Sequence, residues 1–157
     1  MEGNGTTRID RRYCFDNFSN FPVHHSGVTW PTAEHAYQAT KFVLLNNTYT
    51  EHTENICRKI KVAEFTHHVK NIAYMYKDFV REDWCDDLRL QIMEEILRLK
   101  LSQNLYVRSR LFESKDIRII GGCTQHSFWG NGKDHKGDGN LEKLWLKIRS
   151  DLLKGVI

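Results

Sequence analysis

Three polar residues, Glu34, Gln38 and Lys41, stand four and three positions apart in a segment with the composition of a helix. Residues at these spacings share one face of an α-helix. Glu34 and Lys41 are two turns apart, about 10.5 Å along the axis at the usual helical rise, so a ligand can lie between a carboxylate and an amine. The ordinary alternative is a solvated helix face. Trp30-Pro31, directly before the segment, favours a site because it places this face at the start of the helix.

A second segment with ligand-binding potential is the glycine-rich stretch 129–139, which runs from Trp129-Gly130-Asn131-Gly132 to a helix start at Asn140. Backbone N–H groups near the N-terminal end of a helix can hold a phosphate, and Lys133 and Lys136 add positive charge. The stretch is neither a Walker motif nor a dinucleotide fingerprint, and a plain surface loop fits its pattern equally well.

Other residues with catalytic or metal-binding chemistry lack the spacings that such chemistry requires. The eight histidines include the pairs His24-His25 and His67-His68 but form no H-E-x-x-H motif, and the four cysteines form no C-x-x-C pair. No serine stands in a G-x-S-x-G setting. We therefore expect reduced thiols, no metal site and no cofactor.

The elements that position these residues are mainly helical, because apolar residues recur at spacings of three and four through most of the chain. The sequence predicts a predominantly α-helical α+β fold with short β pieces. The predicted elements are β pieces near 13–29 and 117–120, a helix over 33–45, one or two helices over 55–77 with a break at His67-His68, a helix after an Asp83 N-cap, a helix over 105–112, and a last helix with an Asn140 N-cap.

Composition bounds the class of protein. With 157 residues, 40% hydrophobic and 27% charged, the chain suits one compact domain over 1–157, in which we expect residues 1–8 to be flexible. No stretch of eighteen apolar residues and no signal peptide is evident, so we expect an intracellular protein in the cytoplasm or the nucleus. A net charge of +3 permits a phosphate-bearing ligand without requiring one, and Arg8, Arg11 and Arg12 form the one dense basic cluster.

Three blocks of the sequence resemble the NADAR family, also called YbiA-like. The most specific block is Thr29-Trp30-Pro31-Thr32-Ala33-Glu34-His35-Ala36-Tyr37-Gln38-Ala39-Thr40-Lys41-Phe42, and it is preceded by Phe18-Ser19-Asn20-Phe21 and Gly27. The middle block contains Arg81, Trp84, Met93, Lys100, Gln103-Asn104 and Leu111. The closing block is Phe128-Trp129-Gly130-Asn131-Gly132 with the helix over 140–149. The similarity spans roughly residues 15–149. His126 and Gly121 stand where the family usually carries acidic residues.

This resemblance implies an N-glycosidase that acts on ribosylated nucleobases. In such a reaction Glu34 stabilises positive charge at the anomeric carbon or positions a water. Lys41, when neutral, attacks the aldehyde carbon of the opened sugar and forms a Schiff base. Further residues are predicted to bind the substrate: Asn20, Trp30, Gln38, Arg81, Trp84, Lys100, Asn104, His126, Trp129, Gly130 and Gly132.

Within this set, Trp84 or Trp129 is expected to stack a base, and Arg81, Lys100 and the glycine-rich stretch are expected to bind phosphate oxygens. We expect Glu34, Gln38, Trp84 and Trp129 to line one cleft.

Three functional hypotheses follow from the resemblance. The first is removal of ADP-ribose from guanine in nucleic acid. The second is cleavage of small phosphoribosyl compounds of the riboflavin pathway. The third is a binding module that holds ADP-ribose or a nucleotide without turnover, which the departures at His126 and Gly121 would suit. The expected partners are thus an ADP-ribosylated nucleobase or nucleic acid, or a small phosphoribosyl compound, and no membrane; no oligomeric state is assigned.

Overall fold

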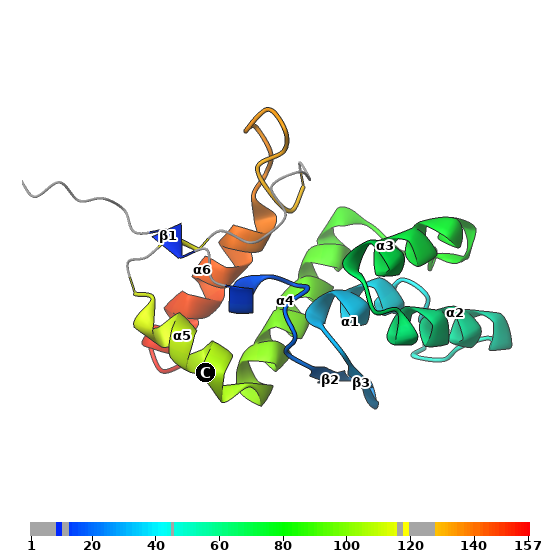
Figure 1. Cartoon of the computed structure of the whole chain (residues 1–157), viewed down its shortest axis with the longest axis horizontal. Coiled ribbons are helices and arrows are strands. Elements are labelled where there is room, and N and C mark those ends of the chain that lie inside the picture. Colours follow the sequence, from blue (N-terminus) through cyan, green and yellow to red (C-terminus); the bar gives the residue numbers. More distant parts are fainter. Residues whose placement is uncertain (1–8, 11–12, 45, 116–117, 120–127) are drawn as a thin grey trace, which may run out of the picture. The chain divides into compact units, whose positions relative to one another are not determined.

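The computed structural model describes residues 9–10, 13–44, 46–115, 118–119 and 128–157 (Figure 1). These residues fall into two compact units, one formed by Phe18–Gln103 and the other by Met1–Asn17 together with Asn104–Ile157. The predicted break at His67-His68 is wrong, because both histidines lie inside a helix and the chain turns at 63–65 instead.

The unit 18–103 is built around a short central helix. Its elements are β2 (Val23–His25), β3 (Val28–Trp30), α1 (Ala33–Thr40), α2 (Glu51–Val62), α3 (Thr66–Met75), the 3-10 turn η2 (Lys77–Phe79) and α4 (Asp86–Gln103). Helix α1 packs against α2, α3 and α4, and β2 and β3 form an antiparallel hairpin. All eight residues of α1 are buried, so its polar residues belong to the core of this unit.

The start of α1 is fixed by Thr32, its N-cap residue. The Thr32 side chain accepts a hydrogen bond from the backbone N–H of His35, which satisfies one of the free donors at the helix N-terminus. The buried His35 ring bonds to Thr32 Oγ1 through Nδ1, at 2.7 Å, and to the carbonyl oxygen of Ala63 through Nε2, at 2.8 Å. Because a carbonyl only accepts, Nε2 carries the hydrogen. The ring therefore ties the first turn of α1 to the end of α2.

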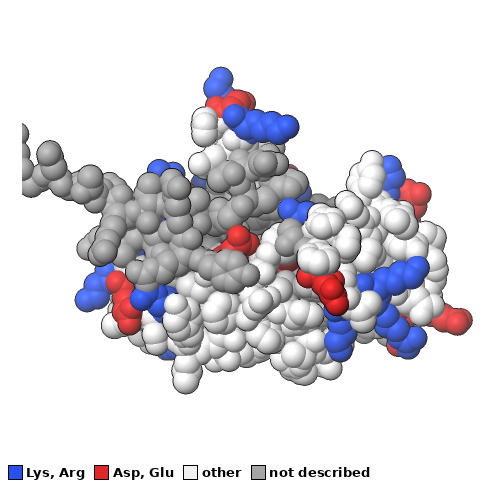
Figure 2. Space-filling model, viewed as in Figure 1, with Lys and Arg blue, Asp and Glu red and all other residues white. Residues whose placement is uncertain are grey.

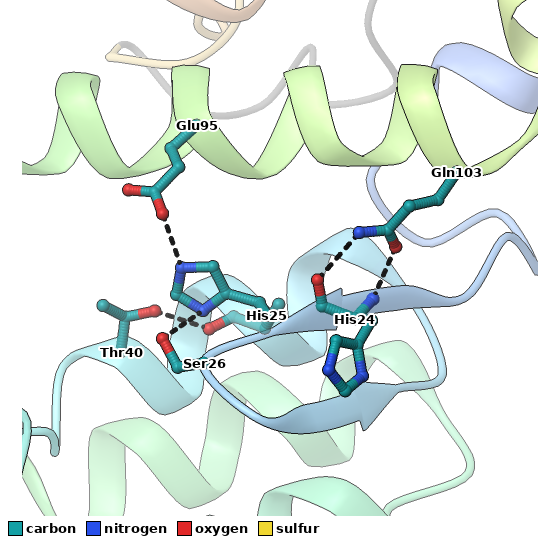
Figure 3. Close-up of polar contacts among 7 residues, drawn as sticks. His24, His25, Ser26, Thr40, Glu95 and Gln103 are labelled. Carbon is teal, nitrogen blue, oxygen red and sulfur yellow. Dashed lines mark hydrogen bonds and ion pairs between the residues drawn. The ribbon is translucent and has the colours of Figure 1, made fainter.

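The β2–β3 hairpin, which leads into α1, is tied to α4 by two side chains (Figure 3). Gln103 accepts from the backbone N–H of His24 at 2.7 Å and donates to its carbonyl oxygen at 2.9 Å. His25 Nε2 lies 3.1 Å from Glu95 Oε1. Since β3 ends at Trp30 and Thr32 caps α1, these contacts also hold the entry to the helix.

Helix α1 ends at Thr40, five residues before the predicted end of the 33–45 helix. Thr40 Oγ1 donates to the carbonyl oxygen of Ala36, and Phe42 and Val43 continue with i to i−3 backbone bonds of the 3-10 type. Lys41 is thus the C-cap residue of α1.

Helix α4 begins at Asp86, so the prediction that Asp83 caps it is wrong. The Asp83 carboxylate instead accepts two hydrogen bonds from the Arg81 guanidinium. Ile92, Met93, Ile96 and Leu97 of α4 are buried and form the side of this helix that faces the core.

The second unit contains β1 (Ile9–Asp10), the 3-10 turn η1 (Tyr13–Phe15), α5 (Leu105–Glu113), β4 (Arg118–Ile119) and α6 (Asn140–Leu153). β1 and β4 pair in parallel. Trp145 of α6 is fully buried, stacks edge-on against Phe15 and donates its indole N–H to the Phe15 carbonyl at 3.0 Å. This contact joins the N-terminal and C-terminal parts of the unit. The predicted helices over 105–112 and from 140 onward are confirmed.

The glycine-rich stretch before α6 closes on itself through backbone hydrogen bonds. Gly137 N–H donates to Asn131, Gly139 N–H to Gly130, Asn140 N–H to Phe128 and Leu141 N–H to Trp129. The prediction of free N–H groups at this helix end is therefore wrong for these four donors. The prediction of an Asn140 cap is also wrong, because the N-cap residue is Gly139, in the left-handed region at φ 61°.

Gly137 is the residue that this closure requires. A Cβ at position 137 would lie 2.3 Å from the Gly130 carbonyl oxygen and 2.5 Å from the Asn131 carbonyl carbon. Both neighbours are backbone atoms, so the loop itself would have to move.

We expect Gly137→Ala to lower the free energy of unfolding by about 1–3 kcal/mol, the usual cost of overpacking. Urea denaturation would measure the loss. Asp138→Ala, at the exposed next position, is the matched control and is expected to change stability by about 0.5 kcal/mol or less. Equal stability of Gly137→Ala and wild type would contradict the closed loop.

Candidate functional site

The polar face of α1 is buried. Glu34 is 5% exposed and Gln38 is 6% exposed, so the alternative of a solvated helix face is wrong. Gln38 Nε2 donates a hydrogen bond of 2.7 Å to Glu34 Oε1. A buried carboxylate is costly unless hydrogen bonds compensate for the lost water, and the i, i+4 spacing supplies one such bond from within the helix.

Lys41 follows α1 and is half-buried beside two aromatic rings. Its Nζ lies 5.4 Å from the centre of the Tyr37 ring and 5.7 Å from that of Trp84. The two rings contact each other at 5.7 Å between centroids. Trp84, which is predicted to stack a base, therefore packs against the Tyr37 ring and lies beside the Lys41 ammonium.

The surroundings of Lys41 favour loss of its proton. Burial lowers the pKa of Lys41, since desolvation disfavours the charged amine. The positive charges of Arg89 on α4 and Lys70 on α3 lower this pKa further, whereas the negative charge of Glu34 opposes the shift. A lysine with a lowered pKa has a larger neutral, nucleophilic fraction at neutral pH.

Arg81 is connected to the same region through its backbone, because its N–H donates to the Lys41 carbonyl at 2.8 Å. Its guanidinium donates to Asp83 at 2.6 and 2.9 Å, and these bonds lower the pKa of the Asp83 carboxyl. If Arg81 binds a phosphate as predicted, its guanidinium would contact both the phosphate and the Asp83 carboxylate.

Lys100 is fully buried, and its Nζ donates to Ser19 Oγ at 2.8 Å and lies 5.6 Å from the Phe21 ring centre. This ammonium therefore packs on the 18–21 segment and has no exposure to solvent. Its predicted role as a phosphate ligand stays a prediction.

The remaining predicted residues divide between the two units. In the unit 18–103, Asn20 is exposed and Trp30 is buried in β3. Asn104, Trp129, Gly130 and Gly132 belong to the other unit. His126 and Gly121 lie outside the described residues. The structure thus brings together Glu34, Gln38 and Lys41 with Trp84, while the predicted common cleft with Trp129 stays a prediction.

The sequence analysis did not identify two further residues that lie near Lys41, Tyr37 and Arg89. Tyr37 stands four residues before Lys41, a spacing that places side chains in contact on a helix, and this signal was available. Arg89 comes from α4 and reaches Lys41 only through the packing of α4 on α1, so no local pattern indicated it.

Among the described residues, no group of three His, Cys, Asp or Glu side chains is arranged to hold a metal ion. In the part of the chain that the structure describes, no helix is both long enough and apolar enough to span a bilayer.

Comparisons with known proteins agree with this architecture. The NADAR domain family matches residues 6–153, so the chain belongs to the NADAR family. The solution structure of the Escherichia coli protein YbiA superimposes with a TM-score of 0.73 and 25% identity, covering 91% of this chain and 79% of that one. The predicted fold class is thereby confirmed.

Relatives in sequence carry two kinds of name. The chain is 28% identical to the N-glycosidase YbiA of Escherichia coli K12 over 141 residues, 88% of this chain and 80% of that protein. It is 29% identical to an N-glycosidase of Nostoc punctiforme, covering 88% and 85% of the two chains. It is also 28% identical to the chloroplastic riboflavin biosynthesis protein PYRR of Zea mays over 151 residues, 88% of this chain but 24% of that protein.

The environment of Lys41 generates a prediction that needs no substrate. After reductive methylation with ¹³C, we expect the Lys41 resonance to titrate at lower pH than a methylated lysine in a short unfolded peptide, because burial lowers the pKa of Lys41. Arg89→Gln removes a positive charge and should move this midpoint to higher pH. Arg98→Gln, also on α4, is the matched control. A Lys41 midpoint equal to that of the peptide lysine would contradict the desolvated environment.

Proposed function

We propose that this protein is an N-glycosidase that cleaves the bond between ribose and a nucleobase, with Glu34 and Lys41 at the reacting centre. The observation that carries the proposal is the pairing, at one buried helix, of a held carboxylate with a lysine of lowered pKa. The names of its relatives support the same reaction class.

Glu34 would act on the charge that the reaction creates. Breaking an N-glycosidic bond builds positive charge at the anomeric carbon, which a carboxylate held in a preorganised position stabilises. The bond from Gln38 holds the Glu34 oxygen from within the same helix. The same carboxylate can position the water that later hydrolyses the intermediate.

Lys41 would provide the nucleophile. In the opened sugar, its neutral amine adds to the C1 carbon, the bond from C1 to the base nitrogen breaks, and the base leaves with a proton. The resulting Schiff base takes up water, which releases the sugar aldehyde and regenerates the amine. The lowered pKa of Lys41 supplies the neutral amine that this step needs.

The preferred substrate is ADP-ribose linked to guanine in nucleic acid. The half-buried Trp84 ring beside Lys41, which packs against the buried Tyr37 ring, suits a flat base or adenine ring. Among the described residues of the unit 18–103 drawn in Figure 2, acidic and basic side chains are interspersed and form no continuous basic stripe for a long duplex. A base held in a single strand or at an end fits this charge pattern better.

A second candidate substrate is a small phosphoribosyl compound of the riboflavin pathway. Riboflavin biosynthesis proteins of Zea mays and Vibrio vulnificus contain a region similar to this chain. The same Glu34 and Lys41 chemistry would apply, because the ribosyl carbon is the centre attacked in both substrates. The third hypothesis, a binding module, predicts ligand binding without product.

We expect Glu34→Gln to keep the fold and ligand binding but to reduce kcat by about 100- to 1000-fold, because the charge is lost while shape and the bond to Gln38 are kept. Steady-state kinetics at matched thermal stability would measure the loss. Glu54→Gln, an exposed acid on α2, is the control. Wild-type turnover in Glu34→Gln would show that Glu34 is a structural acid.

We expect Lys41→Arg to abolish turnover, because arginine stays protonated and cannot form an imine. Borohydride added during turnover should trap a covalent adduct on Lys41 of the wild type, detectable by peptide mass spectrometry. Lys61→Arg on α2 should form the adduct normally. An active Lys41→Arg enzyme without an adduct would refute the covalent route and leave Glu34 to activate water directly.

A further inference from the structure

Gln38 has one buried oxygen without a hydrogen-bond partner among the described residues. Its side chain is 6% exposed, and its Oε1 accepts no hydrogen bond within the part of the chain that the structure describes. Buried side-chain oxygens are nearly always hydrogen-bonded, so such an atom calls for an explanation. A ligand that donates a hydrogen bond is the explanation consistent with the neighbouring site.

The orientation of the Gln38 amide follows from chemistry. A carboxylate can only accept hydrogen bonds, so with Glu34 ionised the NH₂ group must be the part of Gln38 that faces it. The 2.7 Å bond from Nε2 to Glu34 Oε1 has this orientation. The amide oxygen is consequently presented as an acceptor, one helical turn from the Glu34 carboxylate that we propose acts at the anomeric carbon.

We infer that Gln38 Oε1 accepts a hydrogen bond from the 2′-hydroxyl of the substrate ribose. This inference rests on the proposed function, which places the anomeric carbon at Glu34. The 2′-oxygen is two covalent bonds from that carbon, so it is the sugar donor nearest to the reacting atom. Gln38 then selects ribosyl over 2′-deoxyribosyl compounds, and a hydrogen bond to this hydroxyl strengthens as charge develops at the neighbouring carbon.

The binding of sugar phosphates tests the selection without turnover. Calorimetry on the wild type should show that ribose 5-phosphate binds about 10- to 100-fold more tightly than 2-deoxyribose 5-phosphate, the cost of leaving a buried acceptor unpaired. Gln38→Met, which keeps the length of the side chain but has no acceptor, should bind both compounds equally. Thr53→Val, a buried polar change on α2, is the control and should retain the preference.

Kinetics provide the second arm. The ratio of kcat/KM for a ribosyl and a 2′-deoxyribosyl N-glycoside is measured for wild type and for Gln38→Met, and the intrinsic reactivity of the two substrates cancels when the ratios are compared. We expect the ribosyl preference of the wild type to exceed that of Gln38→Met by about 10- to 100-fold, which is the value of this double ratio. A general loss of rate through Glu34 would slow both substrates alike and leave the double ratio near one.

The outcomes separate the two proposals. Cleavage with a double ratio near one, or a preference that survives in Gln38→Met, overturns the role of Gln38 and leaves the N-glycosidase intact. Preferential binding that Gln38→Met abolishes, with no cleavage of any N-glycoside, supports the role of Gln38 and refutes the activity. Absence of both binding and cleavage overturns both.

Discussion

The hydrogen bond from Gln38 to Glu34 is the interaction on which the site depends. Helix α1 is buried along its whole length, so a carboxylate on it has lost most of its contact with water. Burying such a group without compensation costs several kcal/mol. The bond from Gln38 supplies compensation from the same helix and directs the carboxylate. The capping by Thr32 and the His35 bond to Ala63 then fix the helix that carries both groups.

Desolvation has opposite consequences for Glu34 and Lys41, the two groups that we propose react. It makes the fixed charge of Glu34 effective, because a buried field is screened less than one in water. It also lowers the pKa of Lys41, with Arg89 and Lys70 acting in the same direction. The negative charge of Glu34 moderates that shift. Burial thus strengthens the field of a charge on Glu34 and favours a neutral amine at Lys41, the residue that ends the helix.

Much of this arrangement was predictable from sequence because it is local. The i, i+4 and i+3 spacing of Glu34, Gln38 and Lys41 placed them on one face, and apolar periodicity located most helices. The local pattern gave a wrong prediction where a residue makes a different contact. Asp83 accepts hydrogen bonds from Arg81 instead of capping α4. The N–H groups of the glycine-rich stretch donate to carbonyl oxygens of the same loop. Arg89 and the burial of Lys100 depend on packing between distant segments, which periodicity does not report.

The central claim is that this member of the NADAR family breaks a ribosyl–base bond. Its most direct test is mass spectrometry of a single-stranded oligonucleotide carrying one ADP-ribosylated guanine, incubated with the wild-type protein. The account predicts that the oligonucleotide returns to the mass of its unmodified form while free ADP-ribose accumulates in equal amount. Retention of the modified mass, together with an intact phosphoribosyl compound of the riboflavin pathway in a parallel reaction, would contradict it.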